Sequence, residues 1–335
     1  MTMKFRFALF VASSGMICFS FAQADDPRAT RLEALFKKHP EADANQDGEL
    51  TMDEARAFLA DRRSKSNPKS APGMPSRATS RIPGQELEAF FEAKNHGELP
   101  YRWMAPLKQI AGEKYPLILA LHGAGGKGAD NKSNLVGWMA PLVDEALRSQ
   151  HPAFVAVPQA DGTWGTREDF HGLLGAKKEP KNFLPQALSL VEKLVQEHPI
   201  DRNRIYVLGA SMGGYGSWAA IHQRPDLFAA AIPVCGGHPP ERVATFRKVP
   251  IWAFHGANDD KVPVRTSQEL FAALREVGGN MKYTELAGVG HGAAAYAFVF
   301  DANDVEAGWQ TQQTNDRCDP TPKIWDWLFA QRRSN

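Results

Sequence analysis

The sequence predicts an α/β protein whose mostly parallel sheet has helices on both faces, preceded by a small helical segment. Apolar runs alternate with amphipathic helical patterns from residue 84 to the end, and this alternation favours a parallel sheet. Residues 61–83 are basic and rich in Ser and Pro, and such a linker cannot bury a core. Residues 25–60 are acidic and have helical character.

Six runs have the character of buried strands, and helical patterns lie between them. The strand runs are YPLILALHG (115–123), PAFVAVPQ (152–159), RIYVLGAS (204–211), AAAIPVCGG (229–237), VPIWAFHG (249–256) and MKYTEL (281–286). The clearest helical patterns are LPQALSLVEKLVQEH (184–198) and TSQELFAALREVGG (266–279). Residues 84–112 are expected to add two antiparallel strands at one edge of the sheet.

The N-terminus has the three parts of a secretory signal peptide. Lys4 and Arg6 precede the apolar run 7–21, and the small residues of AQA close it at 22–24. The run is too short and too interrupted by polar residues to favour a membrane anchor. The sequence therefore predicts a secreted or periplasmic protein with no membrane span after cleavage. Its segments are a signal peptide (1–24), a calcium-binding segment (25–60), a linker (61–83) and a catalytic domain (84–335).

Composition and charge exclude some partners. The 335-residue chain has 43% hydrophobic and 23% charged residues, as globular proteins do. Its net charge of +1 gives no electrostatic reason to expect nucleic acid or an anionic membrane as a partner. Cleavage would leave Cys235 and Cys318, and both a disulfide and two buried free thiols remain open.

The stretch DANQDGELTMDE (43–54) matches a twelve-residue EF-hand loop. Gly48 supplies the sharp turn, and Ca²⁺ is a hard cation that takes six or more oxygen ligands. The predicted ligands are Asp43, Asn45, Asp47, Glu49 through its carbonyl, Thr51 and Glu54. The alternative is an acidic turn without useful affinity. EF-hands usually pair, and only one such loop is visible in this sequence.

Glycine-rich turns have several functional interpretations, and this chain has two such stretches, YVLGASMGGYGS (206–217) and GAGGKG (123–128). A phosphate-binding P-loop requires a Lys that the first stretch lacks. GAGGKG (123–128) fits a dinucleotide motif, but a polar segment follows it and no suitable acidic residue lies about 20 positions on. The remaining interpretation is a nucleophile elbow, G-x-S-x-G, formed by Gly209, Ser211 and Gly213 between a strand and a helix.

A nucleophilic serine needs a base, and the base needs an acid that orients it. In this type of fold the acid and then the histidine follow the serine along the chain. Asp259 ends a strand run and is preferred to Asp260, and His291 lies in the glycine-rich loop after the next strand. His122 and His255 belong to strand-end HG pairs and are interpreted as structural.

The oxyanion hole and the pocket complete the predicted site. One donor is expected to be the backbone N–H of Met212. The second is expected from Ala124 in HGAGG, with Gly125 as a neighbouring candidate. No cofactor is needed for such catalysis. Trp164 follows a strand end, where lining the pocket and packing beneath a loop are equally compatible with the sequence.

The motifs LHGAGGKGADN, VPQADGTW, GASMGGYGSW, FHGANDDKVPV and GVGHGA together resemble the alpha/beta-hydrolase superfamily. More narrowly they resemble its secreted carboxylesterase, feruloyl-esterase-like and predicted-peptidase group, near dienelactone hydrolase. The resemblance covers residue 84 to the end. It implies an eight-stranded sheet and a triad of Ser211, Asp259 and His291. The sequence departs from the family pattern after His291, where residues 297–319 intervene before the final helix.

These features predict a secreted serine hydrolase that cleaves carboxylic esters through an acyl-enzyme. Family resemblance and export favour a polymeric or glycosidic substrate, such as acetyl or feruloyl esters of plant polysaccharide. A serine peptidase with the same triad is one alternative, and turnover on esters and amides distinguishes the two. A calcium-dependent surface-binding protein with an inactive hydrolase fold is another, and the complete triad argues against it.

Overall fold

The computed structural model divides the chain into two compact units, residues 1–72 and 73–335. It describes residues 84–333 apart from 171–178 and 305–308. Of the first unit it describes residues 36, 37, 39–43, 45, 47, 48, 50, 51, 54 and 58. The predicted signal peptide and linker lie outside the described residues, as does most of the segment 25–60 that is expected to have helical character.

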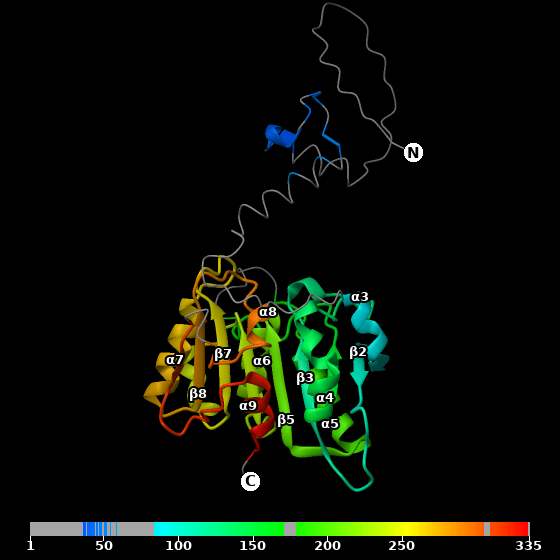
Figure 1. Cartoon of the computed structure of the whole chain (residues 1–335), viewed down its shortest axis with the longest axis vertical. Coiled ribbons are helices and arrows are strands. Elements are labelled where there is room, and N and C mark those ends of the chain that lie inside the picture. Colours follow the sequence, from blue (N-terminus) through cyan, green and yellow to red (C-terminus); the bar gives the residue numbers. More distant parts are fainter. Residues whose placement is uncertain are drawn as a thin grey trace, which may run out of the picture. The chain divides into compact units, whose positions relative to one another are not determined.

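The second unit is built on one nine-stranded sheet with the order β1-β2-β4-β3-β5-β6-β7-β8-β9 (Figure 1). Neighbouring strands from β4 to β8 run parallel. The strands are β1 (Glu92–His96), β2 (Leu99–Met104), β3 (Tyr115–Leu121), β4 (Phe154–Pro158), β5 (Ile200–Ala210), β6 (Ala230–Val234), β7 (Ile251–Gly256), β8 (Met281–Leu286) and β9 (Thr311–Gln313). Each of the six predicted buried runs forms one of the parallel strands, so the prediction of a mostly parallel sheet is confirmed.

The two edges of the sheet are antiparallel. The predicted pair within 84–112 is confirmed as the β1–β2 hairpin, in which His96 pairs with Leu99, and β2 then pairs with β4. At the other edge β9 pairs with β8 through Lys282–Gln313 and Thr284–Thr311. This strand is the ninth where eight were expected, because it forms within the segment after His291 that departs from the family pattern.

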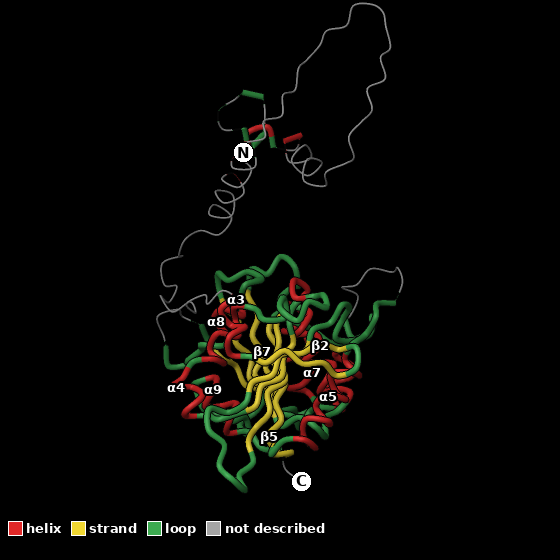
Figure 2. Tube along the Cα trace, turned by 90° about the vertical axis from the view of Figure 1, so that its right-hand side faces the viewer, coloured by secondary structure: helices red, strands yellow, loops and turns green. Residues whose placement is uncertain are grey.

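Helices cover both faces of the sheet, as Figure 2 shows from the side. The α-helices are α3 (Gly84–Leu87), α4 (Glu145–Gln150), α5 (Leu184–Glu197), α6 (Met212–Gln223), α7 (Arg265–Glu276), α8 (Ala294–Ala297) and α9 (Ile324–Ala330). Shorter 3-10 helices are η1 (Pro40–Ala42) in the first unit and η2 (Glu88–Phe90), η3 (Ala124–Gly126), η4 (Gly137–Val143) and η5 (Pro240–Thr245) in the second. Side chains of α5, α6 and α7 form one core, and those of α3, η4, α8 and α9 form the other.

Side chains of the central strands point alternately to the two faces of the sheet, and they contribute to both cores. In β3, Leu119 and its neighbours Leu117 and Leu121 face the core of α5, α6 and α7, whereas Ile118 and Ala120 face the opposite core. All five are almost completely buried, because successive side chains of a strand point to opposite faces. A strand covered on both faces therefore has a continuous apolar sequence, which is the signal that made these strands predictable.

The layered arrangement fixes where loops with polar side chains collect. The parallel strands all end at one edge of the sheet, and the loops after β3, β5, β7 and β8 meet there. No helix among the described residues is long and apolar enough to span a membrane.

Because β3 lies in the centre of the sheet, a substitution in it tests how much the core contributes to stability. We expect Leu119→Ala to lower the free energy of unfolding by about 2–5 kcal/mol, because Leu119 is fully buried and its loss leaves a cavity. Leu107→Ala is the matched control, since Leu107 is 50% exposed and its change should stay within about 0.5 kcal/mol. Urea unfolding of both purified variants measures the difference, and equal losses would contradict this account of the core.

Candidate active site

Ser211 lies at a sharp turn between β5 and α6. Its backbone has φ 58° and ψ −120°, which a residue with a side chain rarely adopts. Two backbone hydrogen bonds hold this conformation: Ser211 N–H donates to Val234 O at 2.9 Å, and Tyr215 N–H donates to Ser211 O at 3.0 Å. The turn places the hydroxyl at the carboxyl edge of the sheet and directly before the N-terminus of α6.

The glycines of the elbow are required by close packing. A Cβ atom on Gly213 would lie 1.9 Å from the carbonyl oxygen of Leu121, and one on Gly209 would lie 2.5 Å from the carbonyl oxygen of Gly213. These atoms belong to backbone that cannot move aside, since Leu121 ends β3 in the centre of the sheet. The two glycines of the G-x-S-x-G pattern are therefore needed because the elbow packs directly against the end of β3.

His291 and Asp259 meet Ser211 in one hydrogen-bonded chain. His291 Nε2 lies 2.9 Å from Ser211 Oγ, and Nδ1 lies 2.9 and 2.8 Å from the two Asp259 carboxylate oxygens. The carboxylate has only lone pairs to offer, so Nδ1 carries the proton and Nε2 is free to accept the serine hydrogen. The side chain of His291 is 28% exposed and that of Asp259 is fully buried, which leaves the histidine accessible to a substrate.

Asp259 follows β7, and its surroundings keep it ionised. Burial by itself would raise the pKa of this carboxyl group, but hydrogen bonds from His255, His291 and the N–H groups of Val262 and Lys261 outweigh burial and hold the pKa well below its usual range. Both N–H groups are 2.9 Å from Oδ1.

The neighbouring acid is placed differently. Asp260 is exposed and pairs with Lys261 at 3.0 Å, so only the first of the two adjacent acids reaches His291. This is the choice that the sequence favoured.

The two expected oxyanion donors belong to segments that adjoin the serine. Met212 is the first residue of α6, so its N–H has no acceptor within the helix. The loop after β3 also comes close to the serine, since a Cβ on Gly123 would lie 3.6 Å from Ser211 Cβ. Ala124 follows as the first residue of η3.

Two buried side chains that the sequence did not single out for this purpose hold the loop after β3. His122 Nδ1 lies 2.7 Å from Gly123 O, and its Nε2 accepts the N–H of Ala160 at 3.0 Å. Gln159 donates from Nε2 to Gly126 O at 3.1 Å. Its oxygen accepts the N–H of Asn131. The sequence signal for both is a polar residue directly after a buried strand.

The sequence left two roles open for Trp164, lining the pocket or packing beneath a loop, and in the structure its side chain packs. Its side chain is fully buried, and its Nε1–H donates to His122 O at 3.0 Å. A Cβ on Gly216 would lie 2.4 Å from Trp164 Cβ, which shows how tightly the indole packs against α6. The ring thus supports the strand end beneath the site and offers no surface to a substrate.

The two cysteines that follow the predicted signal peptide are both buried free thiols in the structure. Cys318 lies 3.5 Å from Thr314 Oγ1, and Cys235 follows β6 with φ 47°. Of the two states that the sequence left open, the structure has the unpaired one.

The candidate calcium loop is described in part, and Glu49 lies outside the described residues. Gly48 has φ 81° and donates its N–H to Asp43 Oδ2 at 2.9 Å, so the chain turns sharply around this carboxylate. Asp43 is 8% exposed, and its Oδ1 has no hydrogen-bond partner in the described part of the chain.

The other described ligand candidates of this loop bond to one another. Asn45 Nδ2 donates to Asp47 Oδ2 at 3.1 Å, and Thr51 Oγ1 donates to Glu54 Oε2 at 2.7 Å. A buried carboxylate oxygen without a donor is the arrangement that a cation would satisfy, so these residues fit Ca²⁺.

Comparison with known proteins identifies the fold. A solved structure described as a thermostable esterase superposes with a TM-score of 0.58 at 32% identity, covering 74% of this chain and 64% of that one. The Prolyl oligopeptidase family model matches residues 145–245, which include β5, Ser211 and α6. The domain has the alpha/beta-hydrolase fold.

Two curated proteins resemble parts of this chain. Poly(3-hydroxyalkanoate) depolymerase C of Paucimonas lemoignei is 31% identical over 136 residues, or 39% of this chain and 29% of its own length. The bifunctional acetylxylan esterase/xylanase XynS20E of Neocallimastix patriciarum is 30% identical over 145 residues, or 43% of this chain and 19% of its own length. The chain thus spans less than a third of the length of each.

The pH dependence of stability tests the state of His122 in this hydrolase domain. Burial lowers the pKa of His122 from 6.5 to about 4, so the folded protein keeps a neutral ring that accepts from Ala160. Between these pH values the unfolded chain binds a proton that the folded chain does not, and stability rises with pH. We expect His122→Gln to flatten this rise in unfolding experiments from pH 4 to 7.

The control is His96→Gln, which changes a half-exposed histidine on β1. If the wild type, His122→Gln and His96→Gln lose stability equally as the pH falls, the neutral His122 is contradicted.

Proposed function

We propose that the chain is an exported serine hydrolase that cleaves carboxylic esters, with Ser211 as nucleophile, His291 as general base and Asp259 as the acid that orients the histidine. The observation that carries the proposal is the hydrogen-bonded chain from Ser211 through His291 to Asp259 at the turn before α6. A serine hydroxyl becomes a nucleophile when a base held in the correct tautomer accepts its proton.

The reaction would proceed through an acyl-enzyme. His291 Nε2 takes the hydroxyl proton while Ser211 Oγ attacks the ester carbonyl carbon, and the ionised Asp259 stabilises the imidazolium. The C–O bond to the alcohol breaks, and His291 returns the proton to the leaving oxygen. A water molecule, deprotonated by the same nitrogen, then attacks the acyl-enzyme and releases the acid and free Ser211.

The N–H groups of Met212 and Ala124 are proposed to stabilise the tetrahedral oxyanion. Losing one such donor typically costs about 2.7–4 kcal/mol of transition-state stabilisation. His122 and Gln159 support this role indirectly, because they hold the loop that carries Ala124. The N-terminus of α6 adds a favourable dipole at the same point.

The substrate is proposed to be an ester of a polymer or glycoside, such as an acetyl or feruloyl group on polysaccharide. The names of the similar proteins, an esterase, a polyester depolymerase and an acetylxylan esterase, favour an ester. Export, proposed from the signal-peptide pattern of residues 1–24, suits extracellular material.

A serine peptidase is the second candidate, because the Prolyl oligopeptidase family model covers the elbow. A calcium-dependent surface-binding protein with an inactive fold is disfavoured by the assembled Ser211, His291 and Asp259.

Ca²⁺ is proposed to bind the loop of residues 43–54 and to stiffen or dock the N-terminal segment without entering catalysis. Asp43, Asn45, Asp47, Thr51 and Glu54 would supply side-chain oxygens, and Glu49 would supply its carbonyl. The buried, unpartnered Oδ1 of Asp43 supports this assignment.

Labelling with a fluorophosphonate tests the nucleophile. We expect the probe to modify Ser211 of the chain from residue 25 onward, located by mass spectrometry, and Asp259→Ala and His291→Ala to slow labelling by about 10³-fold or more. Asp260→Ala is the control, and it should label at the wild-type rate because Asp260 faces solvent. Folded wild-type protein that does not label would defeat the proposal, and faster turnover of peptide amides than of esters would favour the peptidase.

Calorimetric titration of the same chain with CaCl₂ tests the metal site. We expect one Ca²⁺ per chain, and Glu54→Gln should weaken binding by about tenfold or more because the loop loses its carboxylate at position 12. Glu98→Gln, at an exposed acid whose side chain is 94% accessible, should leave the affinity unchanged. Absence of heat in wild type, or equal affinity in both variants, would exclude this loop as a calcium site.

A further inference from the structure

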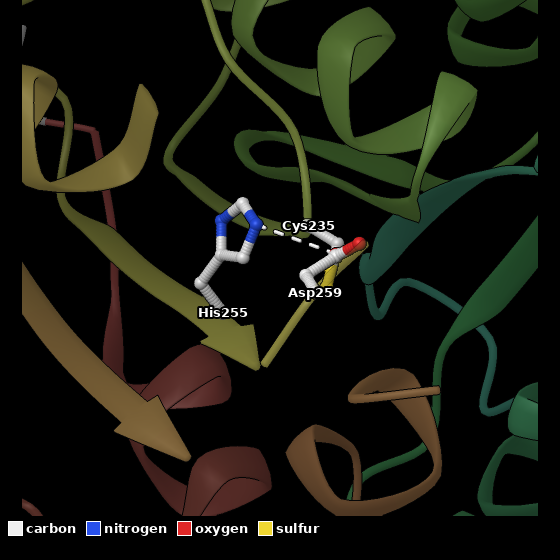
Figure 3. Close-up of side chains that lie close together, drawn as sticks. All are labelled: Cys235, His255 and Asp259. Atoms are coloured by element: carbon white, nitrogen blue, oxygen red, sulfur yellow. Dashed lines mark ion pairs between the residues drawn. The ribbon is translucent and has the colours of Figure 1, made fainter. Parts of the chain in front are cut away.

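A second histidine lies behind the candidate catalytic acid. Figure 3 shows His255 of β7 beside Asp259 and Cys235. One potential ligand atom from each residue lies within 4.8 Å of those of the other two. The His255 ring and the Asp259 side chain are fully buried, and His255 Nε2 is 3.4 Å from Asp259 Oδ2. The sequence had suggested only a structural role for this histidine.

The neighbours of His255 determine where its proton lies. Nε2 is 3.0 Å from Val262 O as well as 3.4 Å from the Asp259 carboxylate, and both neighbours have only lone pairs. A bare Nε2 would face two acceptors at once, so this nitrogen carries a hydrogen. Nδ1 lies 2.7 Å from Ser267 Oγ, a hydroxyl of α7 that donates to it or accepts from it.

His255 therefore acts on Asp259 in two ways. Its Nε2–H is hydrogen-bonded to the carbonyl of Val262 at 3.0 Å, and the N–H of Val262 in turn donates to Asp259 Oδ1 at 2.9 Å. The same Nε2 lies 3.4 Å from the Asp259 carboxylate. Both contacts hold the 259–262 turn in the conformation that directs the carboxylate toward His291. Donors on the carboxylate also spread its charge, which limits how strongly it attracts the proton of His291.

We propose that His255 is a positioning residue of the catalytic site, which fixes the Asp259 carboxylate against His291 through a buried Nε2–H. The inference rests on the proposed function and goes beyond its three residues. It makes the site a His–Asp–His arrangement in which the carboxylate lies between two imidazole rings, that of His291 on the side of the serine and that of His255 inside the core.

The same cluster is not arranged as a metal site. His255 Nε2 is engaged as a donor, and burial raises the pKa of the Cys235 thiol well above its usual range, so this thiol stays uncharged. The titratable groups facing Asp259 are then Cys235 from the end of β6, Tyr215 from α6, His255 from β7 and His291 from the loop after β8. Burial also raises the pKa of Tyr215 to about 12, so its hydroxyl stays uncharged at neutral pH.

Two substitutions separate positioning from packing. His255→Gln places an amide N–H near the position of Nε2, whereas His255→Met fills similar space without a donor. We expect Met to lower kcat on an aryl ester by about tenfold or more with KM within about twofold, because the loss is one of orientation. We also expect His255→Met to raise the apparent pKa of the acidic limb of the kcat/KM profile by about half a pH unit or more. The reason is that one donor fewer then disperses the negative charge of the Asp259 carboxylate. Gln should restore kcat to within about threefold of wild type.

Nitrogen-15 NMR of histidine-labelled wild-type protein gives a second measurement that depends on no variant. We expect His255 to carry a hydrogen on Nε2, and a bare Nε2 would overturn the inference. Equal kcat losses in Met and Gln, or a Met variant with wild-type kcat and an unmoved acidic limb, would overturn it as well. Wild type that neither hydrolyses esters nor labels at Ser211 would defeat the proposed function, whereas active wild type with insensitive variants would defeat only the role of His255.

Discussion

The contact between the turn at Ser211 and the end of β3 is the constraint on which the site depends. Backbone passes so close to backbone there that no side chain fits at Gly209 or Gly213. The approach also forces Ser211 into a conformation with positive φ, which costs of order 1–3 kcal/mol unless the surroundings fix it. The buried sheet and α6 hold Ser211 in this conformation, so the packing of the core offsets the conformational strain.

A buried negative charge lies close to the same place. Asp259 is a fully buried anion, and the side chains behind it are an uncharged thiol and an imidazole that donates a hydrogen. On the other side of the serine, His122 is kept neutral by burial and serves as a hydrogen-bond acceptor. An anion among neutral polar groups is well suited to stabilise the transient cation on His291 that the proposed mechanism requires.

Much of this arrangement could be predicted from sequence because its signals are local. Buried parallel strands have continuous apolar runs, and the elbow and the order of Ser211, Asp259 and His291 follow from the strand ends that carry them. The supporting contacts were not predictable in the same way. Gln159 bonds to residues about 30 positions away, and His255 shares its sequence context with His122 although their neighbours differ. Trp164 shows the same limit, since a strand-end aromatic has no local signal that separates packing from substrate contact.

The short strand β9 has a consequence for how the chain meets other copies of itself. A sheet edge with unpaired N–H and C=O groups is a template on which another polypeptide can add. Here β8 is covered by only three residues, Thr311–Gln313, two of them exposed glutamines. A strand this short and polar leaves little backbone for a further partner to extend. The segment after His291 thereby gives the parallel sheet an edge that resists self-association at high local concentration.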